Sequence, residues 1–562
     1  MKNMTATFKR FLLSFSLMIL MMSGAWAQGN SEKKSAPSGW HTLDRTESGF
    51  YGISLDKAYQ FLKNTPSKTV TVAVIDSGID TTHEDLKPIL WINKGEIPGN
   101  GIDDDKNGYI DDVNGWNFIG GKDGRNVKQD SYEGARVYWK LREKYGEEIP
   151  DTTSMSELEK SEVREYIRAA EKTIGASDPK ELFFMKRILP NLEKGDSIIA
   201  KDLGKSQFTG EDLKSYVSTD IDAKTAASIY LNIAKLNDNY DISNEDILND
   251  LRGQIRKAEA ASTPPANYRS EIVQDDESDI NDRYYGNNDI MANTPMHGTH
   301  CAGIIAAQRG NNIGMDGIAD NVRIMMVRAV PDGDEHDKDI ANAIRYAVDN
   351  GAQIVSMSFG KDFSPEKNWV DDAVKYAASK NVLLVHAAGN DHKNVDSLEN
   401  FPNPIFFDNT GQAANFITVG ASGDPTNGGV TASFSNYGKG EVDVFAPGVN
   451  IYSTLPGGNK YGNLSGTSMA CPVVAGVAAL LLSHYPTFTA EQLKYVIEKS
   501  ATPLKEKVKL PGTDDMVSLA DISKTGGQVN AFEAVKLAAS LSGDQTDKKD
   551  ILPKSKAKRK AD

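Results

Sequence analysis

The stretch Val70-Thr71-Val72-Ala73-Val74-Ile75, which ends in Asp76-Ser77-Gly78, decides the fold. Continuous β-branched and apolar residues of this kind are typical of a strand buried on both faces of a sheet. Similar runs, separated by helical stretches, recur at 322–327, 352–357, 381–385, 416–420 and 442–445. This alternation predicts an α/β fold with a mostly parallel central sheet and helices on both faces. Ligands of such sheets bind at the carboxyl ends of the strands, and Asp76 lies at one of them.

Composition limits the classes of partner. The chain has 562 residues, of which 39% are hydrophobic and 25% charged, an ordinary globular balance. Its 63 basic and 78 acidic residues give a net charge of −15, which argues against nucleic acid or an anionic membrane as the main partner. Two cysteines form neither a disulfide framework nor a four-cysteine zinc site.

The first 27 residues have the pattern of a secretory signal peptide. Lys2, Lys9 and Arg10 precede a short apolar run, and Ala25-Trp26-Ala27 fits a cleavage site. A membrane anchor needs about 20 apolar residues, more than this run offers, and no later segment is expected to span a membrane. We therefore expect an exported protein, periplasmic or extracellular, without stable membrane insertion after cleavage.

Composition shifts divide the mature chain. We expect an N-terminal leader (28–44), an α/β domain in two parts (45–126 and 266–545) and a basic disordered tail (546–562). Residues 127–265 carry helical periodicity and three helix starts, and predict an α-helical insertion between the two parts. The starts are Ser156 with Glu159, Asp178 before Pro179, and Ser243 with Asp246.

Three short motifs carry the residues of a catalytic triad. Asp76 follows the first strand, His297 opens HGTHCAG, and Ser468 lies in SGTSMACP before an apolar helix. Acyl transfer needs a nucleophile, a base that takes its proton and a carboxylate that orients the base. Alone, an Asp after a strand is usually a turn residue and a Ser before a helix an N-cap. Together, in the order Asp, His, Ser, they match a known arrangement of the triad.

On these motifs the chain resembles the subtilisin-like serine proteases, the subtilases. The resemblance extends to Val385–Asn390, where the family carries its oxyanion-hole asparagine, here Asn390, and to the end of the catalytic domain at 527–535. It implies an exported serine endopeptidase that hydrolyses protein or peptide substrates through an acyl-enzyme. It also implies that the substrate groove is lined by Ser358, Phe359, Gly360, Ala387 and Gly389. The alternative is a catalytically silent or latent scaffold that acts in binding or folding assistance.

Two acidic segments are candidate structural calcium sites. Asp103, Asp105 and Asn107, with glycine at position 6, fit a calcium loop. Asn114 stands at position 12 in place of the usual glutamate, so Asp111 and Asp112 are the candidates for the missing carboxylate; a solvated acidic turn is the alternative. The second candidate, Asp85 with Asn312 in the 311–314 loop, rests on resemblance to a calcium site of the family.

Other residues near the motifs leave alternatives open. His300 is three residues after His297, and the two histidines are one candidate pair of zinc ligands. Because the HExxH pattern of such sites is absent, we prefer the interpretation that His300 is a buried structural residue. Cys301 and Cys471 form a disulfide or, preferably, stay free and buried. The resemblance places five acidic residues at a rim of the substrate cleft, where they would favour basic substrates. A solvated loop is the alternative interpretation of these residues, which are Asp332, Asp334, Glu335, Asp337 and Asp339.

The long separation of Asp76 and His297 is the main departure from the family. They are 221 positions apart, whereas family members commonly have a few dozen, and the helical insertion accounts for the excess. Four roles of the insertion remain as alternatives: it covers the cleft, recruits substrates, inhibits the enzyme or simply adds a lobe. The usual N-terminal prodomain is not expected in the short stretch before Val70. The natural substrate, activation route and oligomeric state are likewise open.

Overall fold

The computed structural model describes residues 36–543, except 176–177, 206–207, 237–239, 241, 293–294, 409 and 424–428. The expected signal peptide, the first eight residues of the expected leader (28–35) and the expected basic tail lie outside these residues.

A nine-stranded sheet forms the centre of the described chain, in the order β10-β13-β7-β6-β5-β4-β1-β3-β2. Neighbouring strands are parallel except β10 and β13, which confirms the mostly parallel α/β fold. The strands are β1 (Val70–Asp76), β2 (Gly115–Asn117), β3 (Val322–Arg328), β4 (Ile354–Met357), β5 (Leu383–Ala387), β6 (Phe416–Ser422), β7 (Val444–Pro447), β10 (Thr502–Pro503) and β13 (Gly527–Gln528). Two small antiparallel pairs are β8 (Ile451–Leu455) with β9 (Lys460–Leu464), and β11 (Val508–Lys509) with β12 (Met516–Val517).

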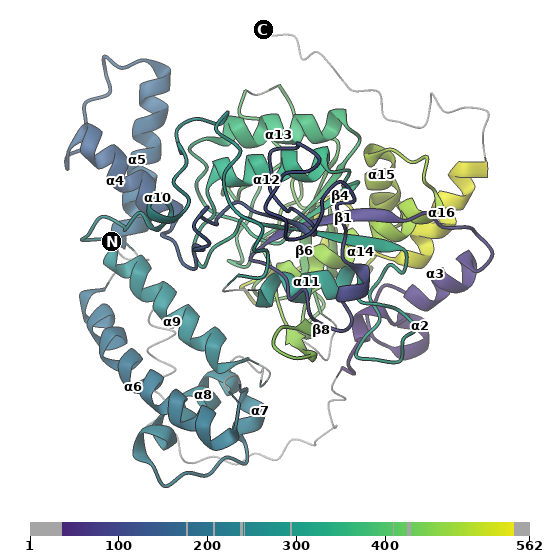
Figure 1. Ribbon diagram of the computed structural model, residues 1–562, viewed down its shortest axis with the longest axis horizontal. Coiled ribbons are helices and arrows are strands. Elements are labelled where there is room, and N and C mark those ends of the chain that lie inside the picture. Colours follow the sequence, from purple (N-terminus) through teal and green to yellow (C-terminus); the bar gives the residue numbers. More distant parts are fainter. Residues whose placement is uncertain are drawn as a thin grey trace. The chain divides into compact units, whose positions relative to one another are not determined.

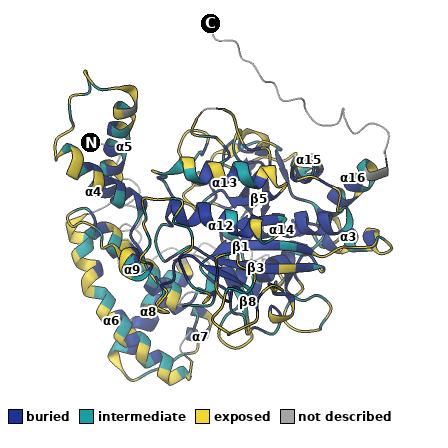
Figure 2. Cartoon of the chain, turned by 45° about the horizontal axis from the view of Figure 1, so that its top comes forward, coloured by how far each residue is buried: buried dark blue, intermediate teal, exposed yellow. Residues whose placement is uncertain are grey.

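Helices cover both faces of the sheet, as expected (Figure 1). On one face lie α11 (Met296–Ala306), α14 (Thr467–His484), α15 (Ala490–Ser500), α16 (Ala531–Gly543) and α3 (Leu55–Leu62). On the other face lie α12 (Asp337–Asp349) and α13 (Lys367–Ser379). In Figure 2 the buried residues are concentrated in the strands and in α12 and α14. The central strands therefore read as continuous apolar runs because both of their faces are covered.

The central helix α14 corrects one expectation. Among the described residues it is the single helix long and apolar enough to cross a membrane, whereas we expected none after the signal peptide. Yet 89% of its residues are buried inside the protein. Its apolarity on all sides is that of a core helix packed between the sheet and other helices.

The folded chain also begins earlier than expected. Trp40 and His41, in the short 3-10 helix η2 (Trp40–Thr42), are buried, and Trp40 Nε1 donates to the carbonyl oxygen of Val449 at 3.0 Å. A second short helix, α2 (Arg45–Ser48), follows. At least residues 40 and 41 of the expected leader thus belong to the folded core.

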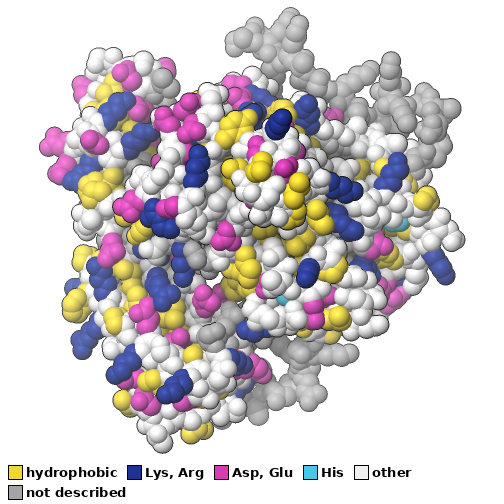
Figure 3. Space-filling view, viewed as in Figure 1, with side chains coloured by type: hydrophobic (Ala, Val, Ile, Leu, Met, Phe, Trp, Pro, Cys, Tyr) yellow, Lys and Arg dark blue, Asp and Glu magenta, His cyan; other side chains and the backbone are white. Residues whose placement is uncertain are grey.

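The helices predicted for 127–265 are present. They are α4 (Glu133–Tyr145), α5 (Glu157–Gly175), α6 (Pro179–Leu203), α7 (Gly210–Leu213), α8 (Ile221–Leu236) and α9 (Asn244–Glu259); α10 (Tyr268–Ile272) follows. Each predicted start is observed, with capping boxes at Ser156 and Ser243 and an N-cap at Asp178. Helices α6 to α9 share an apolar core of their own, whereas α4 and α5 pack against Phe363. On the face drawn in Figure 3, these helices carry acidic and basic side chains interspersed.

The chain leaves the sheet for these helices and returns to it at one edge. Asn117, the last residue of β2, and Asn287 exchange two backbone hydrogen bonds of 2.9 and 3.0 Å. The helical excursion is thereby closed at its base, next to β3.

Candidate active site

The register of the sheet brings the predicted site residues to one edge. Asp76 ends β1 opposite Arg328 of β3, and Ile75 pairs with Met357 of β4. Ser358, Phe359 and Gly360 therefore leave β4 at the same edge as Asp76, and Ala387 ends the neighbouring strand β5. This is the carboxyl edge of the parallel strands, where the sequence predicted the site.

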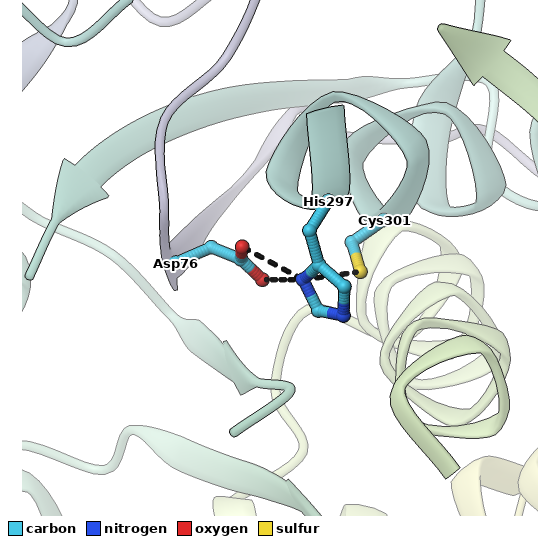
Figure 4. Close-up of side chains that lie close together, drawn as sticks. All are labelled: Asp76, His297 and Cys301. Carbon is cyan, nitrogen blue, oxygen red and sulfur yellow. Dashed lines mark hydrogen bonds and ion pairs between the residues drawn. The ribbon is translucent and has the colours of Figure 1, made fainter. Parts of the chain in front are cut away.

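His297 contacts the Asp76 carboxylate. Its Nδ1 lies 2.8 Å from Oδ1 and 2.9 Å from Oδ2 of Asp76 (Figure 4). Gly298 makes this approach of α11 to β1 feasible, because a Cβ there would lie 2.2 Å from the carbonyl oxygen of Gly78. The glycine after the histidine is thus a steric requirement of the site.

The surroundings of His297 favour its charged form. Burial acts to lower the pKa of the imidazole, but the Asp76 carboxylate and Cys301 outweigh it and hold the pKa well above its usual value. Because Asp76 binds Nδ1, Nε2 is the nitrogen left for proton transfer.

Ser468 lies at the start of α14 and is tied to Ser358. Its Oγ donates to the carbonyl oxygen of Ser358 at 3.1 Å, and Ser358 Oγ donates to the carbonyl oxygen of Ser468 at 2.9 Å. No hydrogen bond joins Ser468 Oγ to His297 within the described chain. Cys301 connects the two residues, since its sulfur is 3.9 Å from His297 Nδ1 and donates to the Ser468 carbonyl oxygen at 3.4 Å. Attack by Ser468 therefore requires rotation of its hydroxyl from Ser358 to the imidazole.

Asn390 and Ser468 present two donors to one region. Oδ1 of Asn390 accepts from the backbone N–H and from the hydroxyl of Thr467. A Cβ on Gly466 would lie 3.5 Å from Ser468 N and 3.7 Å from Asn390 Nδ2. Because Gly466 carries no side chain, this region is free to accept the oxygen of a tetrahedral intermediate.

The remaining predicted groove residues are fixed by hydrogen bonds. The carbonyl oxygen of Phe359 lies 2.7 Å from Nε2 of His386, a residue of β5. Gly389 N–H donates to Thr467 Oγ1 at 3.1 Å, and a Cβ on Gly389 would lie 2.4 Å from Asn436 Nδ2. The segments after β4 and β5 are thus locked to each other and to the start of α14.

The structure agrees with the interpretations that we preferred for His300 and for the two cysteines. His300 is fully buried, its Nε2 lies 3.2 Å from the carbonyl oxygen of Gly462, and burial lowers its pKa to about 3. Cys301 and Cys471 are both free and buried. Cys471 donates to the carbonyl oxygen of Val385 at 3.3 Å, a partner that Cys301 does not share.

The first acidic segment gathers three carboxylates, one of them not predicted. Oxygens of Glu96, Asp105 and Asp112 lie within 4.8 Å of one another. Burial raises the pKa of Asp112 to about 6, against hydrogen bonds that lower it. Three carboxylates this close form a donor set of the kind that Ca²⁺ prefers.

The other predicted ligands of this segment form hydrogen bonds within the loop. Asp103 accepts from the backbone N–H groups of Asn107 and Gly108. Asp111 accepts from those of residues 99–101. Asn107 Nδ2 donates to Asp112 at 3.1 Å.

The second candidate calcium site is assembled only in part. Asp85 is buried, and its carboxylate accepts from the Asn311 amide and from Tyr461 Oη, the latter at 2.8 Å. Asn312 is exposed. Both carboxylate oxygens of Asp85 are therefore already bound by protein donors.

The expected acidic rim is wrong, because four of its five carboxylates are buried or paired with cations and the fifth, that of Asp334, accepts a backbone hydrogen bond. Asp339 is fully buried between Arg269 and Tyr285, and Asp337 binds Lys361. The other three are placed similarly: Asp332 binds Arg256, Asp334 accepts from the backbone of Glu133, and Glu335 is 2% exposed. The sequence shows these charges but not their partners, which lie far along the chain.

Comparisons with known proteins identify the family of this chain. A thermophilic serine proteinase of Bacillus sp. (strain AK1) is 39% identical over 240 residues, 42% of this chain and 52% of that protein. The match therefore spans about half the length of that relative. Thermitase of Thermoactinomyces vulgaris is 36% identical over 271 residues, 47% of this chain and 85% of thermitase. Subtilisin BL of Lederbergia lenta is 38% identical over 209 residues, 37% of this chain and 71% of that protein. The model of the subtilase family matches residues 67–518, most of the chain, and the protein therefore belongs to the subtilase family.

Proposed function

We propose that this protein is an exported serine endopeptidase, periplasmic or extracellular, with Asp76, His297 and Ser468 as its triad. The observation that carries the proposal is the position of His297, bound through Nδ1 to Asp76 and linked to Ser468 through Cys301. Membership of the subtilase family, one of whose matched relatives is named a thermophilic serine proteinase, supports it.

The geometry suggests the following course of hydrolysis. His297 Nε2 takes the proton of Ser468 as its oxygen attacks a peptide carbonyl, and Asp76 stabilises the imidazolium that forms. Asn390 Nδ2 and the Ser468 N–H stabilise the oxyanion. The imidazolium then gives its proton to the leaving amine, and water attacks the acyl-enzyme with His297 again as the base. Ser358–Gly360, Ala387 and Gly389 hold the substrate backbone.

We assign calcium a structural role at Glu96, Asp105 and Asp112, with Asp103, Asn107 and Asp111 shaping the loop. No triad residue belongs to this group of carboxylates, so the cation would stabilise the fold and take no part in the reaction. Asp85 with Asn312 is the weaker candidate, since it offers one carboxylate in place of three and Asn312 is exposed.

Labelling of purified protein with a fluorophosphonate probe tests the function. The probe reacts only with an activated serine, so wild type is expected to be labelled and Ser468→Ala is not. Calcium is kept present and folding is verified by circular dichroism. If folded wild type is not labelled, the alternative of a latent or silent scaffold is favoured, as the Ser468–Ser358 hydrogen bond would allow.

A further inference from the structure

The first turn of α4 carries a buried charge that reaches the substrate groove. Glu133 is 5% exposed, and its Oε2 accepts from Lys361 Nζ at 2.8 Å and from Arg136 Nη2 at 2.6 Å. Lys361 is itself buried and directly follows the groove segment Ser358–Gly360. A residue of the helical excursion is therefore bonded to the end of one groove segment.

The same cations bind the facing segment. Lys361 Nζ also donates to the carbonyl oxygen of Glu335 and to Asp337, both at 2.8 Å. Arg136 Nη2 donates to the carbonyl oxygens of Asp334 at 3.1 Å and Glu335 at 3.2 Å. Both cations thus share the Glu335 carbonyl oxygen, in the segment that follows β3 at the same edge of the sheet as Asp76.

Apolar and further ionic contacts hold this region against α4 and α5. A Cβ on Gly134 would lie 2.9 Å from the ring of Phe363, so α4 packs directly on that ring. The guanidinium of Arg168 in α5 lies 4.2 Å from the centre of the same ring. Lys172 of α5 forms an ion pair with Asp362 at 2.9 Å. Residues 361–363 are consequently fixed from the side of the helical excursion.

The network consists of ion pairs, in which the cations Arg136 and Lys361 bind the buried Glu133 carboxylate. Burial acts to raise the pKa of Glu133, but Arg136 and Lys361 outweigh it and hold this pKa below its usual range. A buried ion pair contributes little net stability, whereas removing one partner leaves an uncompensated buried charge. Such a network defines geometry more than it adds stability.

We propose that Glu133, Arg136 and Lys361 are positioning residues, which set the separation between the groove segment Ser358–Gly360 and the segment Asp332–Glu335 that follows β3. The proposal rests on the proposed peptidase function. It gives the helical excursion a role in binding extended peptides that contact both segments. Small substrates that occupy only the triad and the oxyanion region do not depend on it.

Steady-state kinetics of matched variants test this role. Glu133→Gln and Lys361→Met break the network, while Glu193→Gln is the control, because Glu193 pairs with Arg252 inside the helical excursion. Each variant is assayed on an internally quenched octapeptide and on p-nitrophenyl acetate. The KM for the octapeptide is expected to rise about tenfold, since misplacing a positioned group by about 1 Å costs up to about 100-fold. The kcat for the octapeptide and the turnover of the acetate ester stay within about twofold, as expected for loss of uniform binding.

A double variant and a charge-conserving variant complete the experiment. The double variant Glu133→Gln/Lys361→Met is expected to be no worse than the worse single variant, because the two residues act as one unit. Glu133→Asp keeps the charge and replaces Glu133→Gln if the latter does not fold. An unchanged octapeptide KM in a folded variant, or equal losses on peptide and ester, overturns the proposal.

A separate measurement distinguishes failure of the proposed function. If wild type neither hydrolyses the ester nor reacts with the fluorophosphonate probe, the peptidase function fails. Octapeptide binding to Ser468→Ala, with and without Glu133→Gln, then tests the groove without catalysis. A Kd about tenfold higher with Glu133→Gln supports the positioning role, and an unchanged Kd overturns it.

Discussion

Thr467 donates both its backbone N–H and its hydroxyl to the side-chain oxygen of Asn390, each at 2.9 Å. Two donors to one oxygen fix the orientation of the amide, so that its NH₂ group is the end left for substrate. Thr467 immediately precedes Ser468, and the donor of Asn390 is therefore positioned by the same turn of α14 that carries the nucleophile.

The first prediction concerns Gly466→Ala, which places a methyl group between the two oxyanion donors. The Gly466 backbone is extended and no atom lies within 3.4 Å of the new Cβ, so folding is expected to be unaffected. The kcat on a peptide substrate should fall about 10²–10³-fold, the loss measured in subtilisin when one such donor is removed. Circular dichroism and steady-state kinetics measure both effects.

The control for that prediction is Asn390→Leu, which removes one donor and adds no group near Ser468 N. The double variant is expected to lose little more than either single variant, because both changes act on one oxyanion. Independent, multiplicative losses in kcat would contradict this account of the site.

The second prediction concerns pH and Glu335. Burial raises the pKa of this carboxyl to about 8, so it is neutral in the folded protein at pH 6 but ionised in the unfolded chain. The stability that it contributes is fully present below about pH 4.5 and is lost as the pH rises through about 8. Glu335→Gln mimics the neutral acid and should raise the free energy of unfolding by at least about 1 kcal/mol at pH 8, and by little at pH 4.

Thermal unfolding of wild type and Glu335→Gln between pH 4 and pH 9 measures that difference. A gap between the two melting temperatures that stays constant with pH would show that Glu335 does not titrate in this range.

The third prediction concerns calcium at Glu96, Asp105 and Asp112. Removal of Ca²⁺ with EDTA should lower the melting temperature, since a ligand at 100 times its Kd stabilises the folded state by about 2.7 kcal/mol. Glu96→Gln should weaken the response to Ca²⁺. Asp123→Asn, which changes an exposed carboxylate paired with Arg125, is the control and should respond as wild type does. An unchanged melting temperature in EDTA would refute a calcium site here.

The fourth prediction concerns the thiols. Denatured, unreduced protein should contain two reactive thiols per chain, because Cys301 and Cys471 are free. In the folded protein both should react slowly, because burial raises the pKa of each thiol, that of Cys471 to about 12, and the thiolate is the reactive form. A count with Ellman's reagent before and after denaturation checks this; a count of zero after denaturation would indicate a disulfide.

Local sequence patterns predicted most of the fold. The run before Asp76 identified β1, and Ser156, Asp178 and Ser243 marked helix starts, because caps and strand periodicity act over a few residues. The family motifs located Asp76 and His297 in the same way. Each of these predictions depended on neighbours in the sequence.

Predictions that depended on distant partners failed or were incomplete. Glu96 was missed because it lies seven positions before Asp103, outside the spacing of the calcium-loop pattern. Asp339 was assigned to an open rim because nothing in the sequence links it to Arg269. The role of Glu133 was equally hidden, since its partner Lys361 is 228 positions away.

The backbone exchange between Asn117 and Asn287 has a consequence for chain entropy. Closing a loop costs free energy that grows only with the logarithm of its length, about 0.6 kcal/mol for each doubling. This strand-edge pair closes the long loop that lies between Asp76 and His297. Halving the number of residues in that loop would change the entropic cost of its closure by only about 0.6 kcal/mol. The pairing of the carboxylate with the imidazole is thus nearly independent of how much chain lies between them.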